Sequence, residues 1–157
     1  KTHDVLLYDK VLWNRDAAQR DLIAPVREAL DAAGLSTRVI RYGAYREEEF
    51  LAALRASRSM VFLCEHETQG IAYQQALACD VPILAWDRQG PWLDPAYYPH
   101  RVVFGPASSV PYWDARCGER FATIDEFGVR LQAFIDNARA GLYRPREFVL
   151  DGLTLAQ

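Results

Sequence analysis

Charged residues and a glycine gather in one short segment of the chain. Glu65, His66 and Glu67 directly follow an apolar run, and Gly70 then opens a stretch of small residues typical of a helix. In an open parallel sheet, ligands bind beyond the carboxyl ends of the strands, often with an anion at a helix N-terminus. The spacing therefore predicts a site at this turn for a ligand that carries phosphate.

The same cluster invites other chemistries. Glu65 and Glu67 could be taken for the carboxylate pair of a glycosidase, but residues i and i+2 of an extended segment point to opposite faces and do not easily flank one bond. His66 could hydrogen-bond a phosphate or a sugar hydroxyl, although a lone His more often satisfies a backbone carbonyl. We expect no metal site, because the cysteines are widely spaced and lack the paired ligands that zinc requires.

Short apolar runs predict the strands that must position this turn. The runs are nearly continuous in apolar character, as expected of parallel strands with helices on both faces. Five strands are expected, at Val5–Tyr8, Thr37–Ile40, Met60–Leu63, Pro82–Ala85 and Arg101–Phe104.

Helical patterns separate the first four strands and follow the fifth. Pro25 lies inside the first helical segment, which therefore either begins near Pro25 or bends there. Thr123 and Glu126 form a capping box that begins a long helix ending at Gly141. The remaining stretches 87–100 and 105–121 are expected to be irregular. The other expected helices are Ala18–Ala33, Arg46–Ala56, Gly70–Cys79 and Pro145–Leu150.

This alternation predicts an α/β fold, a doubly wound parallel sheet of Rossmann-like type with a C-terminal helical tail. We expect one domain over residues 1–157, with about five strands in the order 3-2-1-4-5. The site would then lie where the first and fourth strands diverge, at their carboxyl ends. The residues placed there are Lys10, Tyr42, Gly43, the turn 65–70, Asp87, Arg88 and Gly105.

Composition limits the class of protein. The chain has 157 residues and a net charge of −3, so we expect no nucleic-acid partner. No apolar run approaches membrane-spanning length, so at most peripheral membrane contact is expected. Three cysteines at wide spacing suit a reducing, cytoplasmic location. The chain lacks an initiator Met and begins almost directly with a strand, which suggests either a trimmed chain or one half of a larger protein.

The segment Met60–Trp86 resembles the C-terminal, nucleotide-sugar-binding domain of GT-B glycosyltransferases, and Glu67–Ala85 matches a motif of the retaining members. Those enzymes carry two glutamates separated by seven residues, in a phrase like E-G-F-G-L-x-x-L-E-A-M-A-C-G-x-P-V-I-A. Glu67 falls on the first acid, Gly70 on the second glycine and Gln75 on the second acid. The chain therefore has a Glu-x7-Gln variant of the motif, and Asp80 replaces a turn glycine. The phrase Arg144–Leu150 resembles the helix that ends some bacterial members.

The resemblance implies a nucleotide-diphosphate sugar as substrate, with no metal and no other cofactor. It also implies that the chain is the donor-binding half of a two-domain enzyme. The partner domain, an N-terminal acceptor-binding domain, is missing from this chain. We therefore expect the isolated domain to bind the donor weakly and to transfer nothing.

The resemblance further implies roles for single residues. Glu67 would contact hydroxyls of the donor sugar and is the expected catalytic residue, and Gln75 would bind the ribose hydroxyls. Lys10 and Arg15 are the best cations for a diphosphate, unless they are solvated surface charges. Tyr42 and Gly43 would seat the base. The expected donor-binding residues are Lys10, Arg15, Tyr42, Gly43, His66, Gln69, Gly70 and Gln75.

Three other hypotheses stay open. One is a GT-B-like domain without catalytic activity, acting as a nucleotide-binding or protein-interaction module. Another is a sugar-nucleotide epimerase of the same fold. A receiver or flavodoxin-type domain is weaker, because Asp9 is a lone acid after the first strand where a receiver needs an acidic pair.

Overall fold

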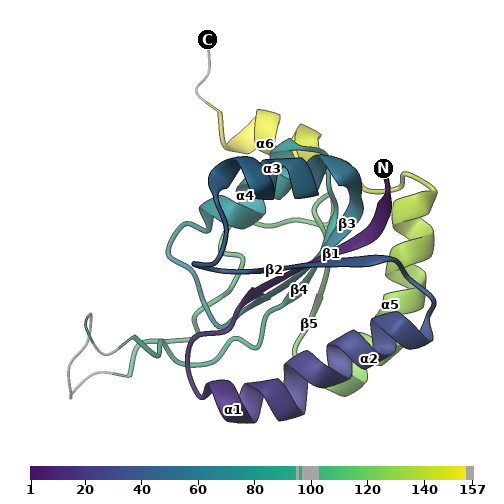
Figure 1. Ribbon diagram of the computed structural model, residues 1–157. Coiled ribbons are helices and arrows are strands. Elements are labelled where there is room, and N and C mark those ends of the chain that lie inside the picture. The colour runs from purple at the N-terminus through teal and green to yellow at the C-terminus, as the bar shows by residue number, and fades with distance from the viewer. Residues whose placement is uncertain (95, 97–102, 155–157) are drawn as a thin grey trace.

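A computed structural model describes residues 1–94, 96 and 103–154 of the chain. Its centre is an all-parallel sheet in the order β2-β1-β3-β4-β5 (Figure 1). The predicted doubly wound, Rossmann-like α/β fold of five strands is therefore confirmed. The strands are β1 (His3–Lys10), β2 (Thr37–Arg41), β3 (Ser57–Cys64), β4 (Ile83–Trp86) and β5 (Gly118–Phe121).

The predicted strand order 3-2-1-4-5 is wrong, because β3 pairs with β1 and not with β2. All but one residue of β3 are buried, so this apolar strand needs a neighbour on each side. β2 carries two arginines and leaves Val39 46% exposed, which suits an edge. The chain therefore reverses its winding between β1 and β3, and not between the first and fourth strands.

The predicted fifth strand, Arg101–Phe104, is also wrong. Residues 101 and 102 lie outside the described residues, and Val103 and Phe104 belong to no strand. The fifth strand is β5, inside a stretch predicted to be irregular. Gly118 makes its pairing possible, since φ is +133° and a Cβ there would lie 2.0 Å from the carbonyl oxygen of Ile83.

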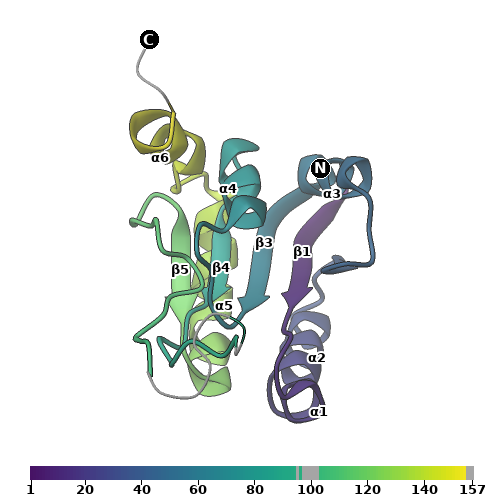
Figure 2. The ribbon, with the colours of Figure 1, turned by 90° about the vertical axis from the view of Figure 1, so that its left-hand side faces the viewer.

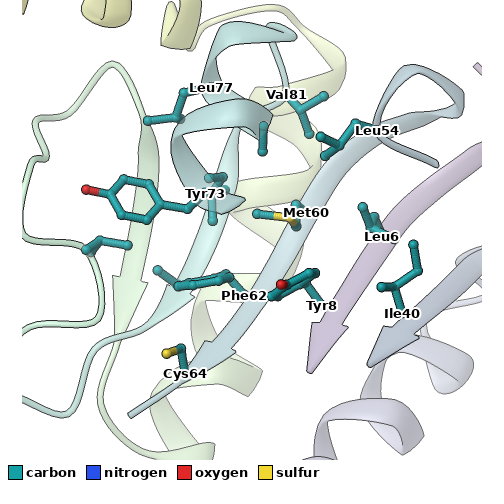
Figure 3. Packing of buried hydrophobic residues seen from close by; sticks show 14 of the residues in the cluster. Leu6, Tyr8, Ile40, Leu54, Met60, Phe62, Cys64, Tyr73, Leu77 and Val81 are labelled. Atoms are coloured by element: carbon teal, nitrogen blue, oxygen red, sulfur yellow. The ribbon is translucent and has the colours of Figure 1, made fainter. Parts of the chain in front are cut away.

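Helices cover both faces of the sheet (Figure 1). They enclose two hydrophobic cores, and Figure 3 shows residues of one of them. One core, which contains Tyr8, Phe62 and Tyr73, lies beneath α3, α4 and α6. The other lies beneath α2 and α5. Figure 2 shows β1, β3, β4 and β5 side by side and running in one direction. The helices are α1 (Arg15–Ala18), the π-helical segment η1 (Gln19–Ile23), α2 (Ala24–Ala32), α3 (Glu47–Ala56), α4 (Ile71–Ala78), α5 (Ile124–Arg139) and α6 (Pro145–Gly152).

The first helical segment is continuous and has its irregularity just before Pro25. The five residues of η1 form a π-helix that leads directly into α2, where Pro25 is in the first turn. Because proline has no N–H and clashes with the preceding turn, a wider local turn accommodates it without ending the helix. Of the two predicted outcomes, a local distortion is the one observed.

The N-terminus of α5 forms half of the predicted capping box, because Thr123 caps Glu126 as expected but the Glu126 carboxylate reaches Ala122 and not the Thr123 N–H. The Thr123 side chain accepts a hydrogen bond from the Glu126 N–H at 3.3 Å, and the Glu126 carboxylate accepts one from Ala122. Among the described residues, no helix combines the length and the apolar character needed to cross a membrane.

Candidate functional site

A cavity of about 300 Å³ lies beside the carboxyl ends of β1 and β3, where the winding of the sheet reverses. This reversal is the place where open α/β sheets bind ligands. The cavity is bordered by the end of β1, the start of α3 and the start of α4. Its lining residues are Tyr8, Lys10, Tyr42, Tyr45, Glu47, Glu67, Thr68, Gln69, Gly70, Ile71, Ala72 and Gln75.

Gly70 sets the entry of α4 at this cavity. Its φ of +74° and ψ of +53° are left-handed, and a Cβ there would lie 2.0 Å from the Tyr73 ring. The Tyr73 ring is in turn buried and hydrogen-bonded to the backbone of Tyr112. The N–H groups of the first turn, at Ile71 and Ala72, have no partner within the helix. Gly70, Ile71 and Ala72 thus present a helix N-terminus to the cavity.

Lys10 supplies the cation that borders the cavity. Its Nζ lies 2.5 Å from Glu67 Oε1 and 4.6 Å from the centre of the Tyr42 ring. Burial lowers the pKa of Lys10, but the hydrogen bond and the charge of Glu67 outweigh it, so the net pKa is raised. The ammonium is therefore fully charged at neutral pH, and only 18% of its side chain is exposed.

A second polar pair lies one helical turn further along α4. The Gln75 side-chain amide donates to Glu47 Oε1 at 2.5 Å, which joins the first turn of α3 to α4. Tyr8 and Tyr45 share a hydroxyl hydrogen bond of 2.7 Å nearby in the lining. Burial raises the pKa of Tyr8 far above its usual value, so the hydroxyl stays protonated.

Two carboxylates hold the loop that follows β1. Glu65 accepts hydrogen bonds from the backbone N–H groups of Leu12 and Trp13, each at 3.0 Å for its nearer oxygen. Asp9 forms a two-pronged ion pair with Arg15. Arg15 is therefore occupied within its own loop and does not line the cavity. Glu65 and Glu67 have separate partners, as their spacing predicted.

His66 lies between two tryptophan rings and outside the cavity lining. Its ring is stacked on Trp92 at 3.9 Å between centroids and tilted against Trp13 at 4.9 Å. Nε2 accepts a hydrogen bond from the Leu93 N–H at 2.9 Å, so the backbone partner is a donor and not the expected carbonyl. Burial, followed by the charge of Arg88, lowers the pKa of His66. The histidine is thus neutral near pH 7.

The structure brings together most, but not all, of the predicted donor-binding residues. Arg15, His66 and Gly43 lie outside the lining, and Gly43 occupies a left-handed turn after β2. The predicted residues that share the cavity are Lys10, Tyr42, Glu67, Gln69, Gly70 and Gln75.

Glu47, Tyr8 and Tyr45 also line the cavity, although their positions in the sequence did not predict this. A glutamate at position 47 is equally well explained by the favourable helix dipole at the start of α3. A tyrosine at position 8 is equally well explained as a buried residue of a strand. With β2 next to β1, the connection from β2 to α3 reaches the same edge as Lys10. Because the predicted strand order also placed β2 next to β1, this connection was the signal that could have pointed to Tyr45 and Glu47.

A larger and shallower hollow, of about 630 Å³, lies along the outer side of β5. It is lined by residues such as Trp113, Arg120 and Arg130, with charges of both signs. Of the described helices, only α5 begins at this hollow, and its start is already capped by Thr123 and Glu126. We therefore assign the functional site to the smaller cavity. Among the described residues, no group of His, Cys, Asp and Glu is arranged to hold a metal ion.

No known family model matches the chain, and no curated protein matches it. Solved structures with the same fold include S. aureus TarM, as a mutant in complex with Fondaparinux, alpha-GlcNAc-glycerol and UDP, with a TM-score of 0.62 and 12% identity. A second structure of TarM has a TM-score of 0.59 and 11% identity. Each match covers 98% of this chain and 33% of TarM, so the chain spans about a third of TarM's length. At this identity the likeness shows the fold alone.

Proposed function

We propose that the chain is the donor-binding domain of a GT-B-type glycosyltransferase, which transfers a sugar from a nucleotide sugar to an acceptor. One observation carries the proposal: the Lys10 ammonium and the N-terminus of α4 border the same cavity at the winding reversal of the sheet. A diphosphate is matched by this combination, since it takes hydrogen bonds from backbone N–H groups and needs a nearby cation.

The fold shared with TarM supports the same reaction class. TarM has been crystallised with UDP and alpha-GlcNAc-glycerol. A nucleoside diphosphate and a glycoside are the two products of sugar transfer from a nucleotide sugar. In this proposal the acceptor binds a separate domain, since the chain corresponds to about a third of TarM.

The cavity residues take distinct roles in the proposed transfer. Lys10 and the amides of Ile71 and Ala72 stabilise the negative charge that grows on the leaving diphosphate. Glu67 contacts hydroxyls of the donor sugar and keeps Lys10 in place through their ion pair. The protein then acts by positioning and charge stabilisation, and its Glu-x7-Gln pattern is a variant of the retaining motif.

Calorimetric titration with UDP and GDP tests the proposal. We expect saturable binding of one nucleotide, weakened about tenfold or more by Lys10→Ala, since hydrogen bonds to charged groups contribute about 1.5–3 kcal/mol. Arg20→Ala is the matched control, because Arg20 pairs with Asp21 on the exposed side of η1. Failure of both nucleotides to bind at concentrations up to about 10 mM would exclude a donor site.

A nucleotide-binding or protein-interaction module without catalytic activity is the second candidate. Two observations favour it. Glu67, the proposed catalytic residue, is engaged with Lys10, and the second acid of the motif is replaced by the amide Gln75. The two candidates differ in whether a full-length protein containing this chain transfers sugar, and whether Glu67→Ala abolishes that transfer.

A further inference from the structure

The cavity contains a second polar pair, Glu47 with Gln75, that the proposed binding of a diphosphate leaves without a role. Three glutamates occupy the first turn of α3, and Glu47 is the one that lines the cavity. Glu49 instead turns back to its own helix start, where it accepts from the Arg46 N–H. A favourable helix dipole would be served by any of the three glutamates, so it does not explain why Glu47 reaches across to α4.

The hydrogen bond between the pair determines which atoms remain for a ligand. A carboxylate only accepts, so the Gln75 amide nitrogen must face Glu47, as it does at 2.5 Å. Two oxygens are left over, Glu47 Oε2 and Gln75 Oε1. Neither has a hydrogen-bond partner among residues 1–94, 96 and 103–154. Two neighbouring acceptors of this kind fit a group that offers two neighbouring donors, such as a vicinal diol.

The separation between the start of α4 and Gln75 suits the hydroxyl pair of a ribose. Gln75 follows Ile71 by four residues, so it lies on the same side of the helix and about 6 Å further along the axis. A phosphate at the helix N-terminus would therefore have the acceptor pair about 6 Å away. In a nucleoside diphosphate, the ribose hydroxyls follow the phosphate at a separation of this order. In dinucleotide-binding sheets an acidic side chain likewise accepts from the ribose.

We infer that Glu47, oriented by Gln75, binds the ribose 2′- and 3′-hydroxyls and makes the site selective for ribonucleotides. The inference rests on the proposed function and adds to it a residue from α3. The carboxylate that position 75 lacks is thus supplied from the neighbouring helix. Glu47 is then a residue that determines specificity by direct contact, and Gln75 both orients Glu47 and offers its own Oε1 to the diol.

The test compares UDP with 2′,3′-dideoxy-UDP, and GDP with its dideoxy analogue, by calorimetry on the full chain. We expect the wild-type chain to bind the ribonucleotide about tenfold more tightly than its dideoxy form, because the lost hydrogen bonds involve a charged acceptor. Glu47→Gln should reduce that preference to about threefold or less. The same substitution should leave binding of the dideoxy nucleotide unchanged or slightly tighter, since a negative charge near the phosphates is removed.

Glu48→Gln is the matched control, because it removes the same charge from the same helical turn outside the cavity lining. It should preserve the full preference for the ribonucleotide. Equal binding of both forms by the wild-type chain would overturn the role of Glu47 and leave the donor site intact. An undiminished preference in Glu47→Gln would do the same. Absence of binding by all four nucleotides would overturn the donor site itself, and the role of Glu47 with it.

Discussion

Lys10 Nζ lies 2.5 Å from Glu67 Oε1, and the two residues come from the neighbouring strand ends of β1 and β3. Both side chains are largely buried, at 18% and 11% exposure. The proposed phosphate-binding cation and the proposed sugar-binding acid are therefore one coupled unit. An anionic ligand that binds the Lys10 ammonium must therefore share this cation with the Glu67 carboxylate.

Glu67→Gln separates the two roles. Removal of the carboxylate charge takes away both a competitor for Lys10 and a repulsion of the phosphates, so UDP should bind about threefold more tightly at low salt. UDP-GlcNAc, used as a probe, should lose any advantage over UDP, because Glu67 no longer accepts from the sugar. Calorimetry with both ligands provides the measurement. Weaker binding of UDP would contradict this expectation and show that the ion pair positions Lys10 for the phosphates more than it competes with them.

Gly70→Ala tests the backbone at the start of α4. The left-handed φ of +74° and the 2.0 Å approach of the new Cβ to Tyr73 should lower the free energy of unfolding by about 2 kcal/mol or more. Urea unfolding measures this change. Gly128→Ala is the matched control, since Gly128 lies within α5 with nothing within 4 Å of its Cβ position. The control should stabilise the chain by about 0.5–1 kcal/mol.

Glu65→Gln tests the loop that follows Lys10. Replacement of the charged acceptor weakens the hydrogen bonds from Leu12 and Trp13, so the free energy of unfolding should fall by about 1–2 kcal/mol. UDP affinity should fall as well, because the loop is attached directly to Lys10. Glu28→Gln, on the exposed side of α2, should change neither quantity. If Glu65→Gln leaves the urea midpoint unaltered, the carboxylate does not hold this loop.

The neutral state of His66 predicts a pH dependence of stability. Its folded pKa is lowered from 6.5, so the unfolded chain binds the proton more readily. The contribution is fully present above about pH 6.5 and is lost as the pH falls from there towards the folded pKa. Thermal unfolding between about pH 7.5 and about pH 5.5 should show a smaller decline for His66→Phe than for the wild type.

The sequence predicted the elements of the fold better than their arrangement. Apolar runs located β1 to β4, and the Thr123 capping box located the start of α5. The order of the strands was predicted wrongly, because it depends on which strand can tolerate the edge of the sheet, and apolar runs alone do not show this. Only the contrast between the charged β2 and the apolar β3 carried that information.

The missed fifth strand has a different cause. Gly118–Phe121 is four residues long and contains two charged side chains, so it lacks the apolar run of the other strands. Its pairing depends on the close approach at Gly118, which is a tertiary feature. Val103 and Phe104 have a strand-like composition but are exposed at 87% and 50%. Local apolar character was therefore misleading in both places.

The candidate site could be predicted in part. Lys10, Glu67 and Gly70 were located by their positions at strand ends and at a helix start, and they meet in the cavity. Glu47 could not be found this way, because its partner Gln75 is 28 residues distant in the chain. Arg15 lies shortly after the first strand, much as Lys10 lies at its end, so its position alone also predicted a site residue. Its guanidinium is instead paired with Asp9.

Mapping of backbone amides by NMR during a titration with UDP and GDP tests the donor-site hypothesis most directly. We predict saturable shifts for one nucleotide, centred on Lys10, Glu67, Gly70 and Ile71, with a smaller group near Glu47 and Gln75. Absence of shifts up to about 10 mM nucleotide would contradict the hypothesis. So would saturable shifts confined to the hollow beside β5.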